Sequence, residues 1–372
     1  MTSTTPSSSP LLPFTNPSLA SSSPASSRRS ASSLHRPFRS AVAKAGLGGG
    51  GGGGFGGGRY AFLTQRARTT NLAVLLLAGV AAVSLLVNLR QWLGNEVFRR
   101  QEDYSTRVPQ SIRGTLQSPH VNLKHLVMVP GHAIWQGCDA TRATEDHDWI
   151  LEPMQKGGAV RTYLKHIVKG AEIAVRDPEA LLIYSGGQTR PSASLTEALS
   201  YARLASAGNL YSQFMSPQQQ QAYAASGGEF DRVTTEDFAM DSMENVLFSI
   251  ARFKEFTGRY PTFITVVGYG MKRRRYEDVH LASVRWPISA ARYIGIDNEG
   301  ETSGDYEGER KFGLEPFLRD TYGCHGALLA KRRKRNPFRR FHSYHSSAPE
   351  LARLLEYCPS NNAIFPGALP WD

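Results

Sequence analysis

The sequence predicts an α/β fold, with a parallel sheet that carries helices on both faces, preceded by one transmembrane helix. Short apolar runs alternate with helical patterns about four times, which is the order of a parallel sheet. Two of these runs end in glycine turns, Ser185-Gly186-Gly187 and Gly268-Tyr269-Gly270. A separate run over residues 72–89 is apolar and uncharged over nearly the length of a bilayer-spanning helix.

Residues 1–70 are expected to form a disordered basic tail rich in serine and glycine. Their serine runs and the glycine run at 48–58 cannot bury apolar surface. A mitochondrial transit peptide is the alternative, because the segment contains arginine and lysine but no acid. The glycines and prolines do not suit an amphipathic helix, which favours a flexible cytosolic tail.

Residues 71–92 are expected to form the transmembrane helix. The segment lies too deep in the chain for a cleaved signal peptide, and a wholly apolar surface is unusual in a soluble domain. The charges before the segment are basic, whereas those after it are mixed. The positive-inside rule therefore favours a cytosolic tail and a lumenal C-terminal domain in an endomembrane. A mitochondrial membrane is the alternative location.

The formal net charge of +11 says little about the folded domain, because much of it lies in the tail and in a second cluster, Lys331 to Arg340. We interpret that cluster as a solvated basic loop, with a nuclear-localisation signal or a lipid-binding segment as alternatives. No nucleic-acid partner is expected, since no groove-reading or stacking motif accompanies it. Cys138, Cys324 and Cys358 show no zinc spacing, so one disulfide and three free thiols are both open.

A linker is expected at 93–120, a sheet domain at 121–300 and a C-terminal extension at 301–372. Predicted strands cover 123–130, 181–183, 232–235, 262–267 and 291–296. Predicted helices cover 160–174, the region after Ser194, the region after Asp241, and a short stretch at 350–357. Residues 208–230 and 299–309 are polar and are interpreted as loops.

Ligands of open α/β sheets bind at the carboxyl ends of strands, and distinctive residues follow two of the predicted strands. Gly131 follows the first strand, and Ser185-Gly186-Gly187 follows the second. Free N–H groups at such a turn favour an anion; a tight turn without a ligand is weighted equally. Glu197 would orient a ligand hydroxyl or complete a capping box with Ser194.

Glu236 ends the third predicted strand and has no local structural explanation. It is the candidate catalytic acid or base, and a hydroxyl acceptor, a metal ligand or an exposed loop acid are the alternatives. Asp241 is expected to cap the next helix, while Glu244 completes the cap and Asn245 contacts the ligand.

Three cations, Lys272, Arg273 and Arg275, follow the fourth strand. Lys272 and Arg273 are candidate ligands for a phosphate or carboxylate. We expect at least one of the three side chains to point into the crevice; a solvated basic helix face is the alternative.

These motifs, in this order, resemble the SanA/YdcF-like family, a Rossmann-like domain of unknown function (number 218), in a fungal membrane-anchored form. The resemblance covers about residues 123–296 and rests on the Ser185-Gly186-Gly187 turn, Glu236, the run 241–245, Tyr269 and Arg273. It implies a Rossmann-like fold and a nucleotide-like ligand, and bacterial members are linked to cell-envelope processes, but it implies no reaction. Gly270 stands where the family has a histidine, so that any inherited histidine chemistry would need His132 or His280 nearby.

The sequence therefore predicts a membrane-anchored Rossmann-like protein that binds a phosphorylated or nucleotide-like small molecule. If the protein is an enzyme, hydrolysis or group transfer is the expected chemistry. The alternative is a non-catalytic interaction protein with a vestigial pocket. A dehydrogenase of the GxGxxG type is not supported, because no such motif follows the first strand, and Walker and GxSxG motifs are absent from the sequence. The sequence identifies no cofactor, metal site or protein partner.

Overall fold

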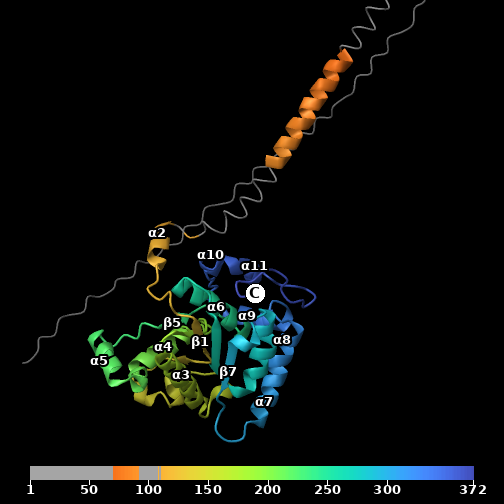
Figure 1. Cartoon of the computed structure of the whole chain (residues 1–372). Coiled ribbons are helices and arrows are strands. Elements are labelled where there is room, and N and C mark those ends of the chain that lie inside the picture. Colours follow the sequence, from red (N-terminus) through yellow and green to blue (C-terminus); the bar gives the residue numbers. More distant parts are fainter. Residues whose placement is uncertain (1–69, 92–107, 109) are drawn as a thin grey trace, which may run out of the picture. The chain divides into compact units, whose positions relative to one another are not determined.

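The computed structural model describes residues 70–91, 108 and 110–372 (Figure 1). The predicted tail at 1–69 and most of the predicted linker lie outside the described residues. The helix at 70–91 and the domain that follows are therefore described separately.

The helix Thr70–Gln91 has 22 residues and is long and apolar enough to cross a membrane. A helix of this length spans about 33 Å, which matches the thickness of the hydrocarbon core of a bilayer. All of its residues are exposed. Its Asn88 side chain donates to the Ser84 carbonyl at 2.8 Å, so this polar group is paired within the helix. The expected apolar helix is present, while its orientation remains a prediction.

Five parallel strands form the main sheet, in the order β5-β4-β1-β6-β7. The strands are β1 (His125–Pro130), β4 (Ala180–Ser185), β5 (Val233–Glu236), β6 (Phe263–Gly268) and β7 (Ala291–Gly295). They alternate with α3 (Ala159–Arg176), α4 (Glu197–Ala207), α6 (Ser242–Thr257) and the π-helical turn η7 (Arg275–Leu281). The predicted α/β fold with a parallel sheet is confirmed. The chain moves from β1 outward to β5 and then returns to β6, so the order reverses between β1 and β6.

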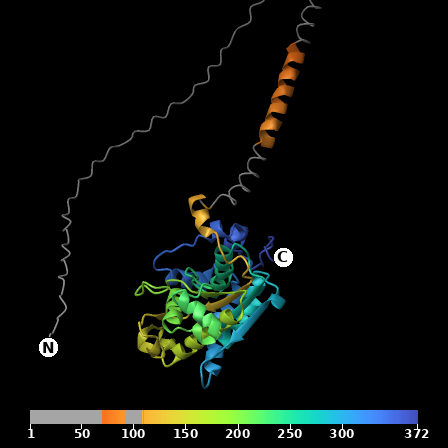
Figure 2. The same ribbon diagram turned by 60° about the vertical axis from the view of Figure 1, so that its left-hand side comes forward.

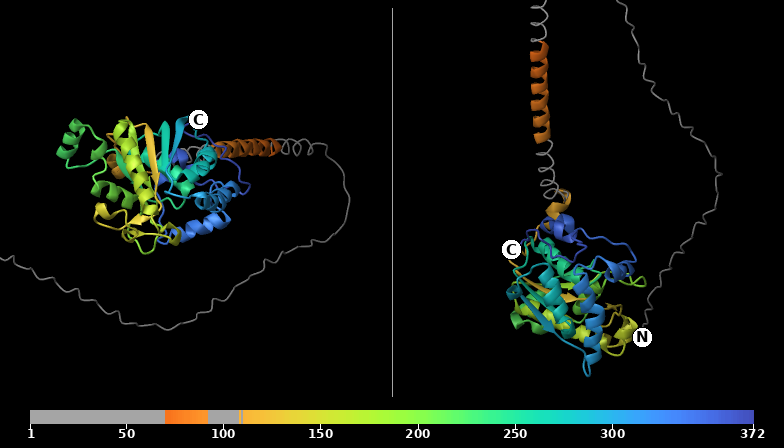
Figure 3. Two further views of the ribbon diagram at one scale, coloured as in Figure 1. Left: turned by 90° about the horizontal axis from the view of Figure 1, so that it is seen from below. Right: turned by 90° about the vertical axis from the view of Figure 1, so that its right-hand side faces the viewer.

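Helices lie on both sides of the sheet (Figure 3). Successive side chains of β1 point to opposite faces, as the pleat requires. Leu126 and Met128 join the hydrophobic core that contains α6, whereas Val127 and Val129 join the core that contains α3 and α4. Two hydrophobic cores therefore hold the sheet, and its carboxyl edge is left between the helix layers.

Three segments that we interpreted as loops contain helices. Residues 208–230 include η5 (Ser212–Phe214) and α5 (Pro217–Ala225), residues 299–309 include α7 (Ser303–Glu309), and the basic cluster begins in α9 (Gly326–Arg335). Glutamine, lysine and arginine are good helix formers, and polarity alone does not distinguish a surface helix from a loop. A capping box at Ser216 also starts α5.

The C-terminal elements pack on the α6 side of the sheet (Figure 2). They are η9 (Arg310–Leu314), α8 (Glu315–Arg319), α9, α10 (Tyr344–Ser347), η10 (Pro349–Leu351) and α11 (Ala352–Leu355). Leu328, Tyr344 and Leu354 share one core with Val246 of α6. A disulfide joins Cys324 to Cys358, and Cys138 is an exposed thiol. Of the two cysteine interpretations, the single disulfide is the one observed.

Shorter elements complete the described chain. Before the sheet lie α2 (Gln110–Arg113) and η1 (Gly114–Leu116), and a two-stranded ribbon pairs β2 (Ile134–Trp135) with β3 (Trp149–Ile150). Single turns are η2 (Ala140–Arg142), η3 (Asp146–Asp148), η4 (Pro153–Gln155), η6 (Gly270–Lys272) and η8 (Ile288–Ala290).

Candidate functional site

A cavity of about 540 Å³ lies at the carboxyl edge of the sheet, where the strand order reverses. Gly131 and His132, which follow β1, form part of its wall, and Tyr269 and Lys272 follow β6 on the other side. Ligands of doubly wound sheets bind at such a reversal point. The volume also falls in the range of small-molecule pockets. The cavity is therefore the candidate functional site.

Among the described residues, four basic side chains line the cavity: Lys272 and Arg275 after β6, and Lys331 and Arg335 on α9. Burial, reinforced first by the charge of Arg275, lowers the pKa of Lys272 to about 7. Burial, reinforced first by the charge of Arg335, lowers the pKa of Lys331 to about 8. The cations are thus close enough to repel one another.

Four acids also line the cavity, Glu197, Asp241, Asp305 and Glu309, but among the described residues only Glu309 forms an ion pair with one of these four cations. Glu309 Oε1 lies 3.1 Å from Arg275 Nε, and Arg335 donates to the Met240 carbonyl at 2.9 Å. Lys272 Nζ has no hydrogen bond or ion pair with any described residue and lies 5.1 Å from the centre of the Tyr269 ring. Lys331 likewise has no such partner in the described part of the chain. Two ammonium groups therefore have donors to offer a ligand.

The opposite wall, beneath β1, is different in character. Glu197 is buried, and its Oε1 accepts a hydrogen bond from Thr189 Oγ1 at 2.6 Å. A Cβ atom on Gly131 would lie 2.6 Å from Glu197 Cβ, so only glycine fits there. His132 stacks on Tyr269 at 5.2 Å, and burial holds its pKa well below the usual value. This wall offers a carboxylate and a neutral imidazole.

The predicted capping box that involved Glu197 is wrong. Thr196 is the N-cap of α4, since its Oγ1 accepts from the N–H of Leu199 at 2.9 Å. Ser194 lies outside the helix. Glu197 is consequently free to face the glycine turns, and its side chain is not used in helix capping.

The Ser185-Gly186-Gly187 turn does not line the cavity. Gly186 N–H donates to the Glu236 carbonyl at 2.9 Å, and Gly187 N–H donates to the Ala239 carbonyl at 2.8 Å. These N–H groups are therefore not free for an anion, which corrects the expectation that the turn cradles one. A Cβ on Gly186 would lie 2.9 Å from Glu197 Cβ, so the glycine permits close packing of α4.

Glu236 is fully buried behind the cavity wall and does not line the cavity. Ser185 Oγ donates to its Oε2 at 2.9 Å, and Phe238 N–H donates to its Oε1 at 2.8 Å. Ala239 N–H and Tyr344 Oη donate at 3.2 Å each. Burial still raises the pKa of Glu236 to about 7. The geometry does not support the predicted direct catalytic contact, because both oxygens are occupied, and an exposed loop acid is also wrong.

Asn245 lines the cavity and connects it to this buried acid. Its Oδ1 position lies 2.9 Å from Ser185 Oγ. A serine hydroxyl has one proton, so it cannot donate to both Asn245 and Glu236. Turning the Asn245 amide lets Nδ2 donate to Ser185 while Ser185 donates to Glu236. Glu236 can therefore influence the cavity through two side chains.

The three cationic side chains after β6 point in different directions. Lys272 and Arg275 are three residues apart and face the cavity together, as helical spacing allows. Arg273 is exposed, donates to the Tyr293 carbonyl at 2.9 Å and pairs with Glu277 at 3.2 Å. The structure thus places Lys272 at the cavity wall and Arg273 outside it.

An ion-pair clamp holds α9 against the start of α6. Asp241 caps α6 through the N–H groups of Met243 and Glu244, at 3.0 Å each. Its other oxygen lies 2.6 Å from Arg332 Nε, and Arg332 also pairs with Glu244 at 3.2 Å. The interpretation of the basic cluster as a solvated loop is therefore wrong for Arg332. Glu244 does not complete the cap with Asp241 as predicted. Its Oε2 accepts a hydrogen bond from the Met240 N–H at 2.7 Å.

His132 and His280, which we considered as replacements for the histidine of the SanA/YdcF-like family, lie in different surroundings. His280 is fully buried, with Nε2 2.8 Å from Ser242 Oγ, and does not line the cavity. His132 does line it, and its buried Nε2 has no partner in the described part of the chain. A Cβ at Gly270 would collide with the Asp297 carboxylate.

Comparison with known proteins gives a distant relative of unknown activity. The chain is similar to the uncharacterized protein YOR238W of Saccharomyces cerevisiae, with 29% identity over 265 residues, covering 59% of this chain and 86% of the yeast protein. No family model and no solved structure matches the chain. The fold and site define a Rossmann-like α/β protein with one apolar helix long enough to cross a membrane.

Proposed function

We propose that this protein binds a phosphorylated, nucleotide-like small molecule in the cavity between the ends of β1 and β6. The carrying observation is the pair of ammonium groups, Lys272 and Lys331, that face the cavity without an acceptor among the described residues. A phosphate supplies several acceptor oxygens and negative charge at once. Binding then relieves the mutual repulsion of the cations.

The remaining wall matches the rest of such a ligand. Glu197 accepts hydrogen bonds from ligand hydroxyls, as a sugar ring offers. The stacked rings of His132 and Tyr269 provide an aromatic surface beside it. A ligand with phosphate at one end and hydroxyl groups at the other satisfies both walls.

We infer membership of the SanA/YdcF-like family from how its motif residues are arranged. Ser185, Glu236 and Asn245 form one hydrogen-bonded chain. Glu197 packs against Gly131 and Gly186, which are the glycines of the first two strand ends. Residues that are scattered along the sequence therefore meet at one edge of the sheet.

Binding is a better-supported proposal than catalysis. Glu236 was the candidate acid or base, yet it is separated from the cavity by Ser185 and Asn245. It acts here as a positioning residue for Asn245. Hydrolysis or transfer remains a proposal that depends on a group other than Glu236, and a partner-docking protein with a vestigial pocket is the alternative.

We further propose that Thr70–Gln91 anchors the protein in an endomembrane and that the C-terminal domain is lumenal. The Cys324–Cys358 disulfide supports this side, because disulfides persist in oxidising compartments. A mitochondrial membrane is the alternative. Alkaline extraction tests the anchor, and release of the protein into the supernatant would contradict it.

The binding proposal is tested by calorimetric titration of the detergent-solubilised full chain with pyrophosphate and ADP. Lys272→Met is expected to weaken binding by about tenfold or more, since a charge-assisted contact is lost. Arg273→Met, one residue away but outside the cavity, is the matched control and should bind within about twofold of the unmodified chain. Equal affinities of the two variants, or no binding by the unmodified chain, would favour the partner-docking alternative.

A further inference from the structure

We propose that a second surface of the domain docks on an anionic lipid bilayer. It consists of Arg333, Lys334, Phe338, Arg339 and Phe341, here called the basic–aromatic patch. All five residues are exposed, with Phe338 46% and Phe341 75% accessible. Cations beside exposed aromatic rings are the combination that binds the interfacial region of a membrane.

The charges of the patch are not neutralised by the protein. Arg333, Lys334 and Arg339 make no side-chain hydrogen bond or ion pair within the described part of the chain. No acid occurs in the sequence between Asp320 and Glu350. Electrostatic attraction to anionic lipids strengthens the binding of a surface that also buries apolar side chains. The patch therefore has three cations available for lipid phosphates.

The patch is held in a defined shape by a turn. Asn336 Oδ1 accepts from Arg340 N–H at 2.8 Å, and Asn336 Nδ2 donates to the Arg340 carbonyl at 2.9 Å. Arg340 itself points inward over the Phe238 ring, 4.7 Å from its centre. Phe338 and Arg339 thus occupy the tip of a closed loop, which lowers the entropy cost of inserting them at a surface.

The two faces of α9 serve different purposes. Lys331 and Arg335 face the cavity, and Arg332 is clamped to Asp241, whereas Arg333 and Lys334 are exposed. The patch is therefore separate from the cavity, although one helix contributes to both. The proposed ligands differ as well, because the patch would bind a membrane surface and the cavity a small molecule.

The chain tethers the domain that carries this patch to the apolar helix. The segment leads directly into α10. Residues 92–109 connect α2 to the apolar helix, and a chain of that length reaches at most roughly 60 Å. An anchored helix therefore keeps the domain at high effective concentration near lipid. The exposed phenylalanines and this tether favour a membrane over an acidic protein partner.

The test uses the full chain reconstituted in vesicles, with a protease site introduced after Gln101. Vesicles contain either phosphatidylcholine alone or phosphatidylcholine with phosphatidylserine, and retention of the domain on the vesicles is measured after cleavage. We expect retention on the anionic vesicles, release from the neutral ones, and release at high salt because screening weakens the attraction.

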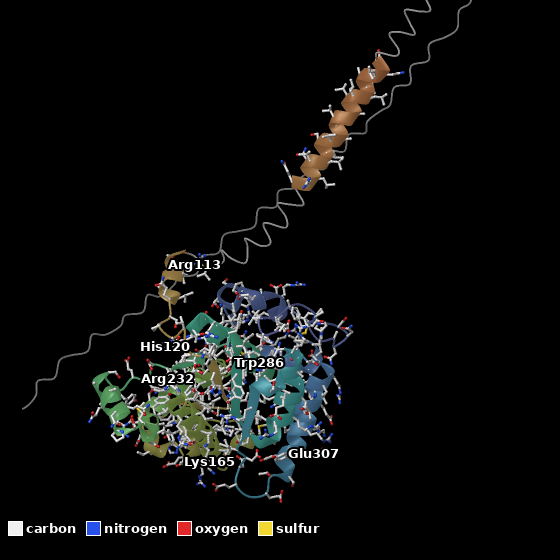
Figure 4. The ribbon with its side chains drawn as sticks, viewed as in Figure 1. Arg113, His120, Lys165, Arg232, Trp286 and Glu307 are labelled. Atoms are coloured by element: carbon white, nitrogen blue, oxygen red, sulfur yellow. A yellow bond between two sulfur atoms is a disulfide. The ribbon has the colours of Figure 1, made fainter. Side chains whose placement is uncertain are left out.

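Two variants and one matched control make the test specific. Arg333→Glu/Lys334→Glu/Arg339→Glu and Phe338→Ser/Phe341→Ser should each reduce retention by about tenfold or more. Arg161→Glu/Lys165→Glu/Arg176→Glu reverses as many charges on α3 and should be retained; Lys165 lies at the end of the domain away from Arg113 (Figure 4). Release of the unmodified domain from both vesicle types, or equal retention of all variants, would overturn the proposal, and the first result would favour an acidic protein partner.

Discussion

Two charged clusters lie at the carboxyl edge of the same sheet, and they differ in how completely their charges are satisfied. On the β5 side, Glu236 accepts four hydrogen bonds and is sealed from the cavity. On the β6 side, Lys272 and Lys331 face the cavity without an acceptor among the described residues. A buried group whose hydrogen-bond partners are all present holds the fold, whereas a group that lacks partners is available to a ligand. The difference assigns structure to the first cluster and binding to the second.

The largest effect is expected at the sealed cluster. Glu236→Ala removes the acceptor of four donors, and unsatisfied buried donors cost about 1–3 kcal/mol each. The unfolding free energy should fall by about 3 kcal/mol or more, as measured by chemical denaturation. Glu229→Ala, at an exposed position, is the control and should change little. A stable Glu236→Ala variant would mean that the acid is not structural.

The same residue predicts a dependence of stability on pH. The pKa of Glu236 is raised by burial from 4.5 to about 7 in the folded protein. The folded state therefore holds this proton more tightly, so the unfolding free energy should fall as the pH rises from 4.5 to 7. The loss attributable to this group is about 3 kcal/mol. The Glu236→Gln side chain cannot ionise, so the unfolding free energy of this variant should change less between pH 4.5 and 7. Equal changes in the variant and the unmodified protein would show that Glu236 does not cause the pH dependence.

Arg332 holds α9, which carries Lys331 and Arg335, against the start of α6, because it pairs with Asp241 and Glu244. Arg332→Met removes the cation that pairs with these carboxylates and should lower the unfolding free energy by about 2 kcal/mol, the value of a hydrogen bond between charged groups. It should also weaken pyrophosphate binding, since Lys331 and Arg335 lose their support. Arg333→Met is the neighbouring exposed control and should leave both quantities unchanged. Normal binding by Arg332→Met would show that the clamp does not position the cations.

The smallest effect is the pH dependence of anion affinity at the open cluster. Lys272 has a pKa lowered to about 7, so it loses its charge as the pH rises through neutrality. Sulfate keeps a constant charge over this range. Its affinity should fall by about tenfold between pH 6 and 8.5, because Lys272 loses its charge and Lys331, whose pKa is lowered to about 8, loses part of its own. Lys272→Met should show a weaker dependence; an identical profile would assign the titration to another group.

The sequence predicted the strands and turns of the sheet better than the positions of the charged side chains. Strands and glycine turns have local signals, namely short apolar runs and residues that fit close packing at Gly131 and Gly186. The cap at Asp241 was also correct, since Asp241 accepts from two N–H groups of the first turn. Polar helices such as α5 were missed because their periodicity lacks an apolar stripe.

The candidate site could be predicted only in part. The sequence marked Lys272, Glu197 and Asn245, which do line the cavity. It could not show that Lys331 and Arg335 join Lys272, because about sixty residues separate them and the clamp through Arg332 is a tertiary contact. It also could not show that Arg275 faces the cavity and Arg273 does not, because the direction of each side chain depends on the turn after β6. The burial of Glu236 depends on Tyr344, a residue far along the chain.

The central claim is that the cavity presents an unpaired amine to an anionic ligand. Reductive methylation of the full chain near neutral pH, followed by mass spectrometry, measures it directly. Lys272 should react faster than Lys165, which pairs with Glu299 at 2.6 Å, because only an uncharged amine is reactive and the pKa of Lys272 is lowered. Pyrophosphate should slow the reaction at Lys272 and leave Lys165 unchanged. Slow reaction at Lys272 that pyrophosphate does not affect would contradict the account.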